Sequence, residues 1–254
     1  MIGAYKGATA LFVFTFLLAL LITAPASLLD HYLQNATGGR LVLSNAGGTI
    51  WSGSATPALR PQTGYALALQ PLRWEVAMRP LLGGKIAVRL QWDVSPAAPP
   101  MSAVVSFDRA ELHQARLLLP ARIIEEASPA LKPARLHGQL QIQGEKIALS
   151  KNGIEGGVTV DWLRAGSAFS SVDPLGDYRL TLSGAGDHVR IGLATISGKL
   201  LLEGQGSWSV ARGLEFRGRA QASPENREAL AELLRNLGPE EAPGIHGFNL
   251  TPQR

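Results

Sequence analysis

The sequence predicts a mainly β protein, with a single N-terminal apolar helix, an antiparallel sheet domain and one amphipathic helix near the C-terminus. Three observations support this fold class. Residues 7–29 carry no charge, apolar and polar residues then alternate in one segment after another, and Gly-containing pairs separate many of these segments. With 254 residues, the chain is long enough to bury a substantial core.

The uncharged N-terminal stretch predicts a transmembrane anchor over residues 7–29. From Ala8 to Ala24 a helix spans about 26 Å, which is just enough for a bilayer core, and Pro25 stops the helix. Lys6 precedes the stretch, and the first charge after it is Asp30. The positive-inside rule therefore places residues 1–6 in the cytoplasm and everything after residue 29 across the membrane, which in a bacterium is the periplasm.

A cleaved signal peptide is the alternative interpretation of the same stretch. Ala24-Pro25-Ala26 fits the small-x-small cleavage pattern, and only one Lys precedes the apolar run. The apolar stretch slightly exceeds the usual length of a signal-peptide core, which favours a retained anchor. Either way, the following domain is exported.

The exported part, residues 30–243, predicts strands with one apolar and one polar face. The alternation is clearest over 86–94, 158–162 and 178–182. Tight reversals are expected at Gly83-Gly84, Gly144-Glu145 and Asn152-Gly153, where glycine supplies a positive φ. Since consecutive strands follow too closely for helical crossovers, the sheet should be an antiparallel meander.

Two helices interrupt this pattern. Ser223 is the expected N-cap of a helix whose stripe of Leu230, Leu233, Leu234 and Leu237 ends before Gly238-Pro239. The stripe favours packing on the sheet of its own domain over docking on a partner. A shorter helix is expected over 120–127. Proline-rich stretches indicate a possible sub-boundary around 96–133, and residues 244–254 are expected to form a loose tail.

Composition and motif searches argue against catalysis. The chain has no Cys, its five His are dispersed along the sequence, and no metal-binding or nucleophile motif is found. We therefore expect no catalytic, metal or cofactor site and no enzymatic activity. The net charge is +4, but the basic residues are spread singly, so nucleic acid is not an expected partner.

All five Trp residues lie in strand-like segments. Core packing or a sheet-edge anchor is the simpler interpretation, and an exposed aromatic contact patch is the alternative. These residues are Trp51, Trp74, Trp92, Trp162 and Trp208.

The order of several motifs resembles type II secretion system protein N, an accessory inner-membrane subunit of Gram-negative secretion machinery. Together the motifs cover nearly the whole chain. They are Gly48-Thr-Ile-Trp51-Ser-Gly53-Ser-Ala55, Pro71-Leu-Arg-Trp74, Val160-Asp161-Trp162-Leu-Arg-Ala-Gly166-Ser-Ala168, Pro174-Leu-Gly-Asp-Tyr-Arg-Leu180, Thr195-Ile-Ser-Gly-Lys-Leu-Leu-Leu-Glu-Gly204 and Phe216-Arg-Gly-Arg-Ala220. The residues selected as a candidate structural or interaction motif are Gly48, Trp51, Gly53, Asp161, Trp162 and Gly166.

The resemblance implies a single-pass inner-membrane protein with a periplasmic β-rich domain that supports the export of folded proteins. Its partners would be other secretion subunits, namely the inner-membrane platform or the secretin, and the family supplies no catalytic residues. Kinship with AsmA-like proteins offers an alternative function in lipid binding or outer-membrane maintenance, with a curved sheet holding lipid in an apolar groove. A covered apolar sheet face would favour a compact scaffold. An open trough lined by Leu140, Ile142, Val160, Leu180 and Ile191 would favour lipid.

Overall fold

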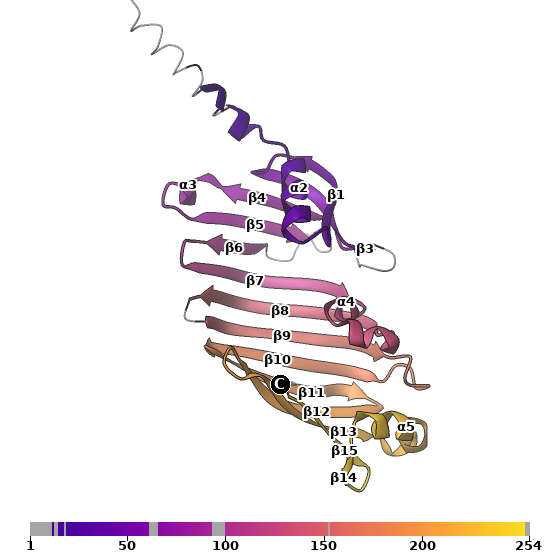
Figure 1. Cartoon of the computed structure of the whole chain (residues 1–254). Coiled ribbons are helices and arrows are strands. Elements are labelled where there is room, and N and C mark those ends of the chain that lie inside the picture. Colours follow the sequence, from indigo (N-terminus) through magenta and orange to yellow (C-terminus); the bar gives the residue numbers. More distant parts are fainter. Residues whose placement is uncertain are drawn as a thin grey trace, which may run out of the picture. The chain divides into compact units, whose positions relative to one another are not determined.

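A computed structural model describes residues 12, 15–17, 19–60, 66–92, 100–151 and 153–251. It divides the chain into two compact units, Met1–Val104 and Val105–Arg254, here called unit 1 and unit 2. The division falls inside the region where proline-rich stretches indicated a sub-boundary, 96–133. Each unit is built on an open antiparallel sheet with short helices at its margins (Figure 1).

Unit 1 contains a small sheet with the strand order β1-β2-β4-β5, in which β3 also pairs with β2. Helix α2 lies against β1, where Asp30 Oδ1 accepts a hydrogen bond of 2.7 Å from the backbone N–H of Leu43. Ala26, Ala55 and Trp74 form the buried centre of this unit. The elements are α2 (Ser27–Ala36), β1 (Leu41–Gly48), β2 (Ser52–Leu59), β3 (Leu67–Ala68), β4 (Leu72–Ala77), α3 (Met78–Leu81) and β5 (Ile86–Trp92), with β6 (Met101–Val105) at the boundary of the units.

Unit 2 contains a longer meander with the order β7-β8-β9-β10-β11-β12-β13-β15-β14, and its neighbouring strands are antiparallel. Short helices lie beside the strand ends (Figure 1). The elements are β7 (Arg109–Pro120), α4 (Ile123–Ala127), η1 (Pro129–Ala134), β8 (His137–Ser150), β9 (Gly153–Gly166), β10 (Gly176–Gly186), β11 (His188–Gly198), β12 (Leu200–Ser209), β13 (Gly213–Ala222), η2 (Pro224–Asn226), α5 (Arg227–Leu237), β14 (Glu240–Ala242) and β15 (Ile245–Leu250).

In unit 2, the register places residues of similar polarity opposite each other on neighbouring strands. Directly opposed residues in antiparallel strands share a face, so their side chains form rows that cross the sheet. One such row is entirely aliphatic, and the neighbouring row on the other face is polar. The aliphatic row is Leu117, Ile142, Val160, Leu180 and Leu193, and the polar row is Arg116, Gln143, Thr159 and Thr181.

Helix α5 closes one end of the apolar face, as its leucine stripe predicted. Leu230 is fully buried and Leu234 is 4% exposed, packed with Tyr178 and Leu200 in the core of unit 2. Leu237 lies at the margin and is 37% exposed. The expected N-cap was wrong in detail. A 3₁₀ turn precedes α5, and the Ser223 hydroxyl accepts a hydrogen bond from the Asn226 side chain instead of from a helical N–H.

Two local expectations need correction. Gly144-Glu145 does not form a turn, since β8 continues through these residues and has an irregular register against β9 between Gln143 and Ile147. The loose tail expected over 244–254 is also wrong for Ile245–Leu250, because this segment forms β15 and pairs with β13. Of the other expected reversals, one lies between Ser150 and Gly153, as predicted.

The anchor expected over 7–29 lies partly outside the described residues, which omit 1–11, 13, 14 and 18. Phe12, Thr15–Leu17 and Ala19–Ile22 are helical. Among the described residues, no helix has the length and apolar character needed to cross a membrane.

The packing of α5 predicts that Leu230→Ala destabilises unit 2 strongly. Removing a fully buried leucine side chain leaves a cavity that costs about 2–5 kcal/mol. Leu237→Ala, on the same helix but 37% exposed, is the matched control and should cost less than about 1 kcal/mol. Urea unfolding of both variants measures the free energy of unfolding. Equal losses of this free energy would show that burial of Leu230 does not stabilise the packing of α5 on the sheet.

Candidate functional site

The six residues selected from the sequence separate into two groups, one in each unit. Each group is described within its own unit. Gly48, Trp51 and Gly53 lie in unit 1, and Asp161, Trp162 and Gly166 lie in unit 2.

Trp51 connects the end of the N-terminal helix to the sheet of unit 1. Its indole Nε1–H donates a hydrogen bond of 2.7 Å to the carbonyl oxygen of Leu21. Its own carbonyl oxygen accepts a hydrogen bond of 2.7 Å from the N–H of Val76 in β4. The Leu21 carbonyl also accepts a longer hydrogen bond of 3.4 Å from the N–H of Ala24, so the indole adds a second and shorter hydrogen bond at this helix C-terminus.

The chain after this helix is bound to the same motif. The N–H of Ala26 donates to the carbonyl of Gly48 and the N–H of Ile50 donates to the carbonyl of Ala24, both at 3.0 Å. Pro25 forms an isolated antiparallel bridge with Thr49. Ala24 and Ala26 are 8% and 1% exposed. We call Leu21, residues 24–26, residues 48–53 and Trp74 the N-terminal junction.

Two glycines make this junction possible. Gly53 lies under the indole of Trp74, and a Cβ there would come within 2.5 Å of Trp74 Cζ2. Trp74 is 7% exposed, and its Nε1–H lies 3.2 Å from the carbonyl oxygens of both Thr49 and Ile50. Gly48 has a φ of +88°, a left-handed conformation that favours glycine. The sequence pattern of the motif therefore reflects a close approach of backbone and ring.

Asp161 makes an ion pair on the polar face of unit 2. Both carboxylate oxygens accept hydrogen bonds of 2.7 Å from the Nε and an Nη of Arg179 in β10. The hydrogen bonds from the guanidinium lower the pKa of the Asp161 carboxyl below its ordinary value. The pair joins β9 to β10 and so acts as a cross-strand contact.

Trp162 lies on the opposite face and packs beside Tyr178, with ring centroids 6.2 Å apart. Its Nε1–H donates a hydrogen bond of 3.0 Å to the carbonyl of His137. The Tyr178 hydroxyl donates to the carbonyl of Leu200 at 3.0 Å, and burial raises the pKa of this phenol. Sequence reasoning missed the role of Tyr178, although its alternation with Leu180 placed it in a strand.

Gly166 leaves room for His137, since a Cβ on this glycine would overlap the imidazole ring. The His137 Nε2 lies 2.8 Å from Asp173 Oδ1, and this hydrogen bond raises the pKa of the imidazole. Both side chains are about half exposed, and the pair joins β8 to the loop before β10. An isolated His in the sequence gave no signal of this contact.

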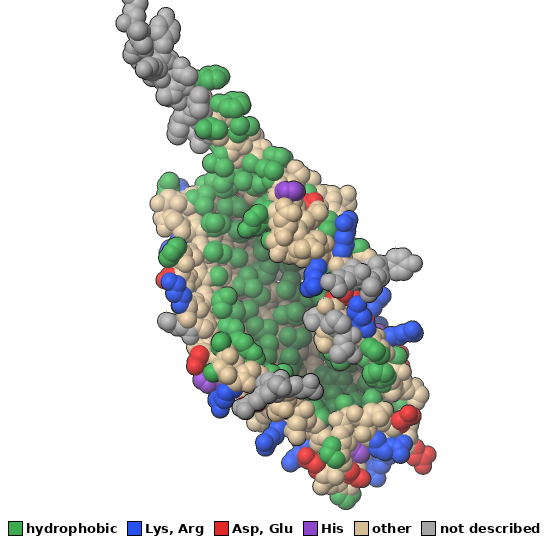
Figure 2. All heavy atoms as spheres, in the orientation of Figure 1, with side chains coloured by type: hydrophobic (Ala, Val, Ile, Leu, Met, Phe, Trp, Pro, Cys, Tyr) green, Lys and Arg blue, Asp and Glu red, His purple; other side chains and the backbone are tan. Residues whose placement is uncertain are grey.

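The middle of the unit 2 sheet presents an apolar face. We define this apolar face as Leu117, Ile142, Val158, Val160, Leu180, Leu182, Ile191 and Leu193, all of which are partly exposed. Figure 2 shows hydrophobic side chains gathered in a hollow on one face, with charged side chains at its margins. Of the five residues expected in an open trough, Leu140 is buried and the other four are partly exposed.

At β12 and β13, aromatic rings from β13 and β15 cover glycines at the end of the apolar face. A Cβ on Gly204 or Gly218 would collide with the ring of Phe216 or Phe248, respectively. These two rings are stacked with centroids 6.1 Å apart. The glycines of this part of the sheet thus provide the space that the phenylalanine rings fill.

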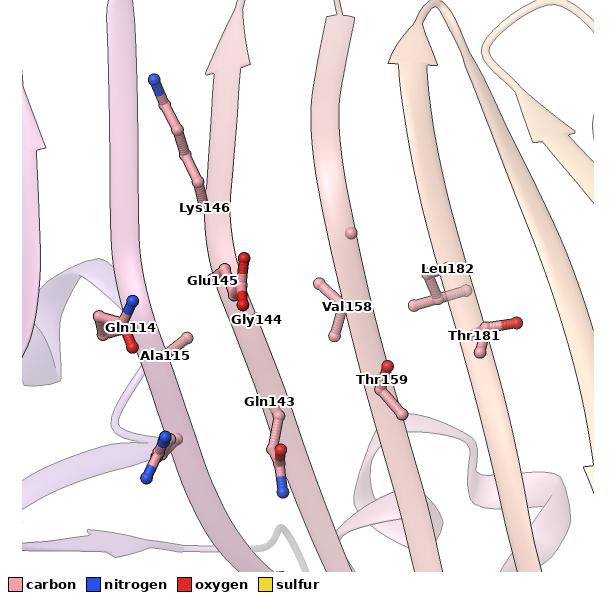
Figure 3. Close-up of a pocket in the computed structure, with 12 residues that line it drawn as sticks. Gln114, Ala115, Gln143, Gly144, Glu145, Lys146, Val158, Thr159, Thr181 and Leu182 are labelled. Carbon is pink, nitrogen blue, oxygen red and sulfur yellow. The ribbon is translucent and has the colours of Figure 1, made fainter. Parts of the chain in front are cut away.

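A shallow depression of about 630 Å³ follows the irregular part of β7 and β8 (Figure 3). Its polar side chains are all exposed or partly exposed, so they are suited to hydrogen bonding and do not form a buried reactive group. Within the described ranges, no group of three or more His, Asp or Glu residues is arranged to hold a metal ion. The polar lining consists of Gln114, Arg116, Gln143, Glu145, Lys146, Thr159 and Thr181.

The junction predicts that Gly53→Ala destabilises unit 1, because the new methyl group would overlap the Trp74 ring and the Gly47 carbonyl. We expect a loss of about 1–3 kcal/mol in urea unfolding. Gly47→Ala is the control within the same motif, since a Cβ there has no atom within 4 Å, and it should be neutral or slightly stabilising. Equal effects of the two substitutions would contradict the close-approach explanation.

The Asp161–Arg179 pair predicts a stability difference that depends on pH. The native pKa of Asp161 is lowered, so its contribution is fully present above the unfolded value of about 3.8 and disappears as the pH falls through the native pKa. Wild type should therefore be more stable than Asp161→Asn at pH 6, and the difference should shrink in the acid range. Glu203→Gln, on an exposed residue of the same unit, is the control. A difference independent of pH would reject the ion pair as its cause.

Comparison with known proteins identifies a family for this chain. A family model described as "Type II secretion system (T2SS), protein N" matches residues 39–249, which include both motif groups and α5. Neither the curated proteins nor the solved structures contain a match to the chain. Since the matched range is well over half of the sequence, the chain belongs to the type II secretion system protein N family.

Proposed function

We propose that the protein is an inner-membrane accessory component of the type II secretion apparatus. It supports the export of folded periplasmic proteins across the outer membrane through structural contacts, without catalysis. The family match over residues 39–249 is the observation that carries this function. The candidate residues support a structural role, because they hold strands, rings and loops together instead of converging on a reactive group.

The anchor of the proposed component is the apolar segment of residues 7–29. Residues 1–6 lie in the cytoplasm, and the β-rich domain of residues 30–243 lies in the periplasm. The absence of charge from 7–29 supports this arrangement, and so do the apolar side chains that the described part of the segment exposes. Phe12 is 71% exposed, Phe16 55% and Leu20 52%.

The N-terminal junction supports retention of the anchor over cleavage. Of the residues that fit a signal-peptidase site, Ala24 and Ala26 are buried and pair with Ile50 and Gly48, whereas Pro25 is exposed. Cleavage would also remove Leu21, the hydrogen-bond acceptor of Trp51.

We propose that the inner-membrane platform or the secretin contacts the exposed surfaces of unit 2. Trp162 packs against Tyr178 within unit 2, so its ring is not the main surface offered to a partner. The apolar face, whose side chains are partly exposed, offers a larger surface than this one ring. The short β14 pairs with β15 only at Ile245 and His246, so Phe248–Leu250 lie beyond its end. Unpaired backbone groups at a sheet edge accept a partner strand.

Lipid binding or outer-membrane maintenance is the second candidate function, and the apolar face favours it. Its rows of aliphatic side chains are partly exposed in the part of unit 2 that the structure describes. An acyl chain can lie along such a row without leaving a polar group unpaired. Under this function, the bound ligand would be lipid in an apolar groove.

Deletion of the gene distinguishes the two candidates. We expect a type II substrate to accumulate in the periplasm while the permeability barrier of the outer membrane stays intact. Complementation with Leu180→Gln, on the apolar face, should restore export less well than Thr181→Gln, its neighbour on the polar face. Immunoblotting of periplasm and medium, with a dye-permeability assay, measures both properties. Normal export together with a leaky envelope would reject the secretion role and favour lipid maintenance.

A further inference from the structure

The connection between β4 and β5 presents apolar side chains to solvent. Leu82 at its tip is 95% exposed, and Met78 and Ile86 on either side are 50% and 48% exposed. Single exposed apolar residues are ordinary, but three within nine residues of one connection form a local patch. We call residues 78–86 the β4–β5 tip.

The backbone of the β4–β5 tip is held in a compact turn. Helix α3 is followed by hydrogen bonds from the N–H groups of Gly83 and Lys85 to the carbonyl of Pro80, both at 3.0 Å. The N–H of Gly84 donates to the carbonyl of Leu81 at 3.0 Å, and Gly84 has a φ of +68°. Leu82 is therefore displayed by a hydrogen-bonded turn whose backbone is already ordered.

The charged residues of the tip are all basic. Arg79 and Lys85 are both exposed, and the sequence from Val76 to Trp92 contains no acidic residue. Glu75, the nearest carboxylate before the tip, makes an ion pair of 3.2 Å with Arg89. An apolar tip flanked by two cations complements a surface that offers acyl chains beneath anionic groups.

The strand that leads into the tip is connected to the N-terminal apolar segment. Trp51 binds Leu21 at the end of that segment and Val76 of β4, each through a hydrogen bond of 2.7 Å. Two residues after Val76, the chain enters the tip at Met78. The same indole residue thus connects the segment to the strand that leads into the tip.

We propose that the β4–β5 tip inserts into the surface of an anionic bilayer, beside the segment that anchors the protein. Leu82, Met78 and Ile86 enter the acyl region, and Arg79 and Lys85 bind the anionic headgroups. The inference rests on the proposed membrane anchoring. It adds a second point of attachment, which fixes how unit 1 is oriented on the membrane.

Depth-dependent quenching tests this inference on the full chain. Since the sequence has no Cys, Leu82→Cys can carry a single environment-sensitive fluorophore. The labelled protein is reconstituted into vesicles of phosphatidylcholine with or without phosphatidylglycerol, with quenchers attached to the lipid acyl chains. We expect strong quenching at Leu82 in the anionic vesicles. Pro71→Cys, an exposed position just before β4 and therefore at its other end, is the matched control and should not be quenched.

Charge reversal at Arg79→Glu and Lys85→Glu should weaken insertion of the tip in anionic vesicles, roughly fivefold for each cation, and have little effect in neutral ones. Phe12→Cys reports on the anchor separately. A quenched Phe12 probe with an unquenched Leu82 probe would overturn the inference and leave the anchor intact, whereas an unquenched Phe12 probe would contradict the anchor itself. If the fluorescence of the Leu82 probe reports an apolar environment but the acyl-chain quenchers have no effect on it, the tip contacts protein instead of lipid. That result would also overturn the inference.

Discussion

The structure depends on one constraint, which is the two-residue period of side chains held in antiparallel register. Val160 lies opposite Ile142 and Leu180, while its neighbour Thr159 lies opposite Gln143 and Thr181. A slip of one residue would move the aliphatic side chains of a strand to the polar face and the polar side chains to the apolar face. The separation of the two faces therefore depends on the register. Because the match repeats from β7 to β11, aliphatic side chains collect on one face and polar side chains on the other. The apolar face of unit 2 follows directly from this repetition.

The margins of the sheets are where the larger packing interactions occur. Helix α5 buries Leu230 against one end of unit 2, and the N-terminal junction buries Trp74 in unit 1. Aromatic rings pack over glycines in both units, with Trp74 over Gly53 and Phe248 over Gly218. Such contacts hold the strand ends and connections, and they leave the aliphatic rows between them partly exposed. The motif residues selected from the sequence therefore make mainly packing contacts and hydrogen bonds within their own units.

The sequence predicted the β class, the antiparallel order and α5 because all three depend on local periodicity. It could not distinguish a glycine that turns the chain from one that makes room for a neighbour. Gly144 was expected in a turn, yet it lies within β8, where a Cβ would meet Ile147 at 3.0 Å. β15 was missed, although His246, Phe248 and Leu250 alternate with a period of two. The hydrogen bond between Trp51 and Leu21 joins residues thirty positions apart, and no local pattern contains that information.

Disulfide trapping between β9 and β10 tests the register most directly, because the chain has no native cysteine. Cysteines at Val160 and Leu180, which lie directly opposite each other, should oxidise readily to a disulfide. Cysteines at Val160 and Thr181, which lie on opposite faces, should not. Mass spectrometry of the oxidised full chain distinguishes these outcomes. Efficient trapping of the first pair alone is the result that we expect. Trapping of the second pair instead would mean a register shifted by one residue, which would contradict the apolar face and the function assigned to it.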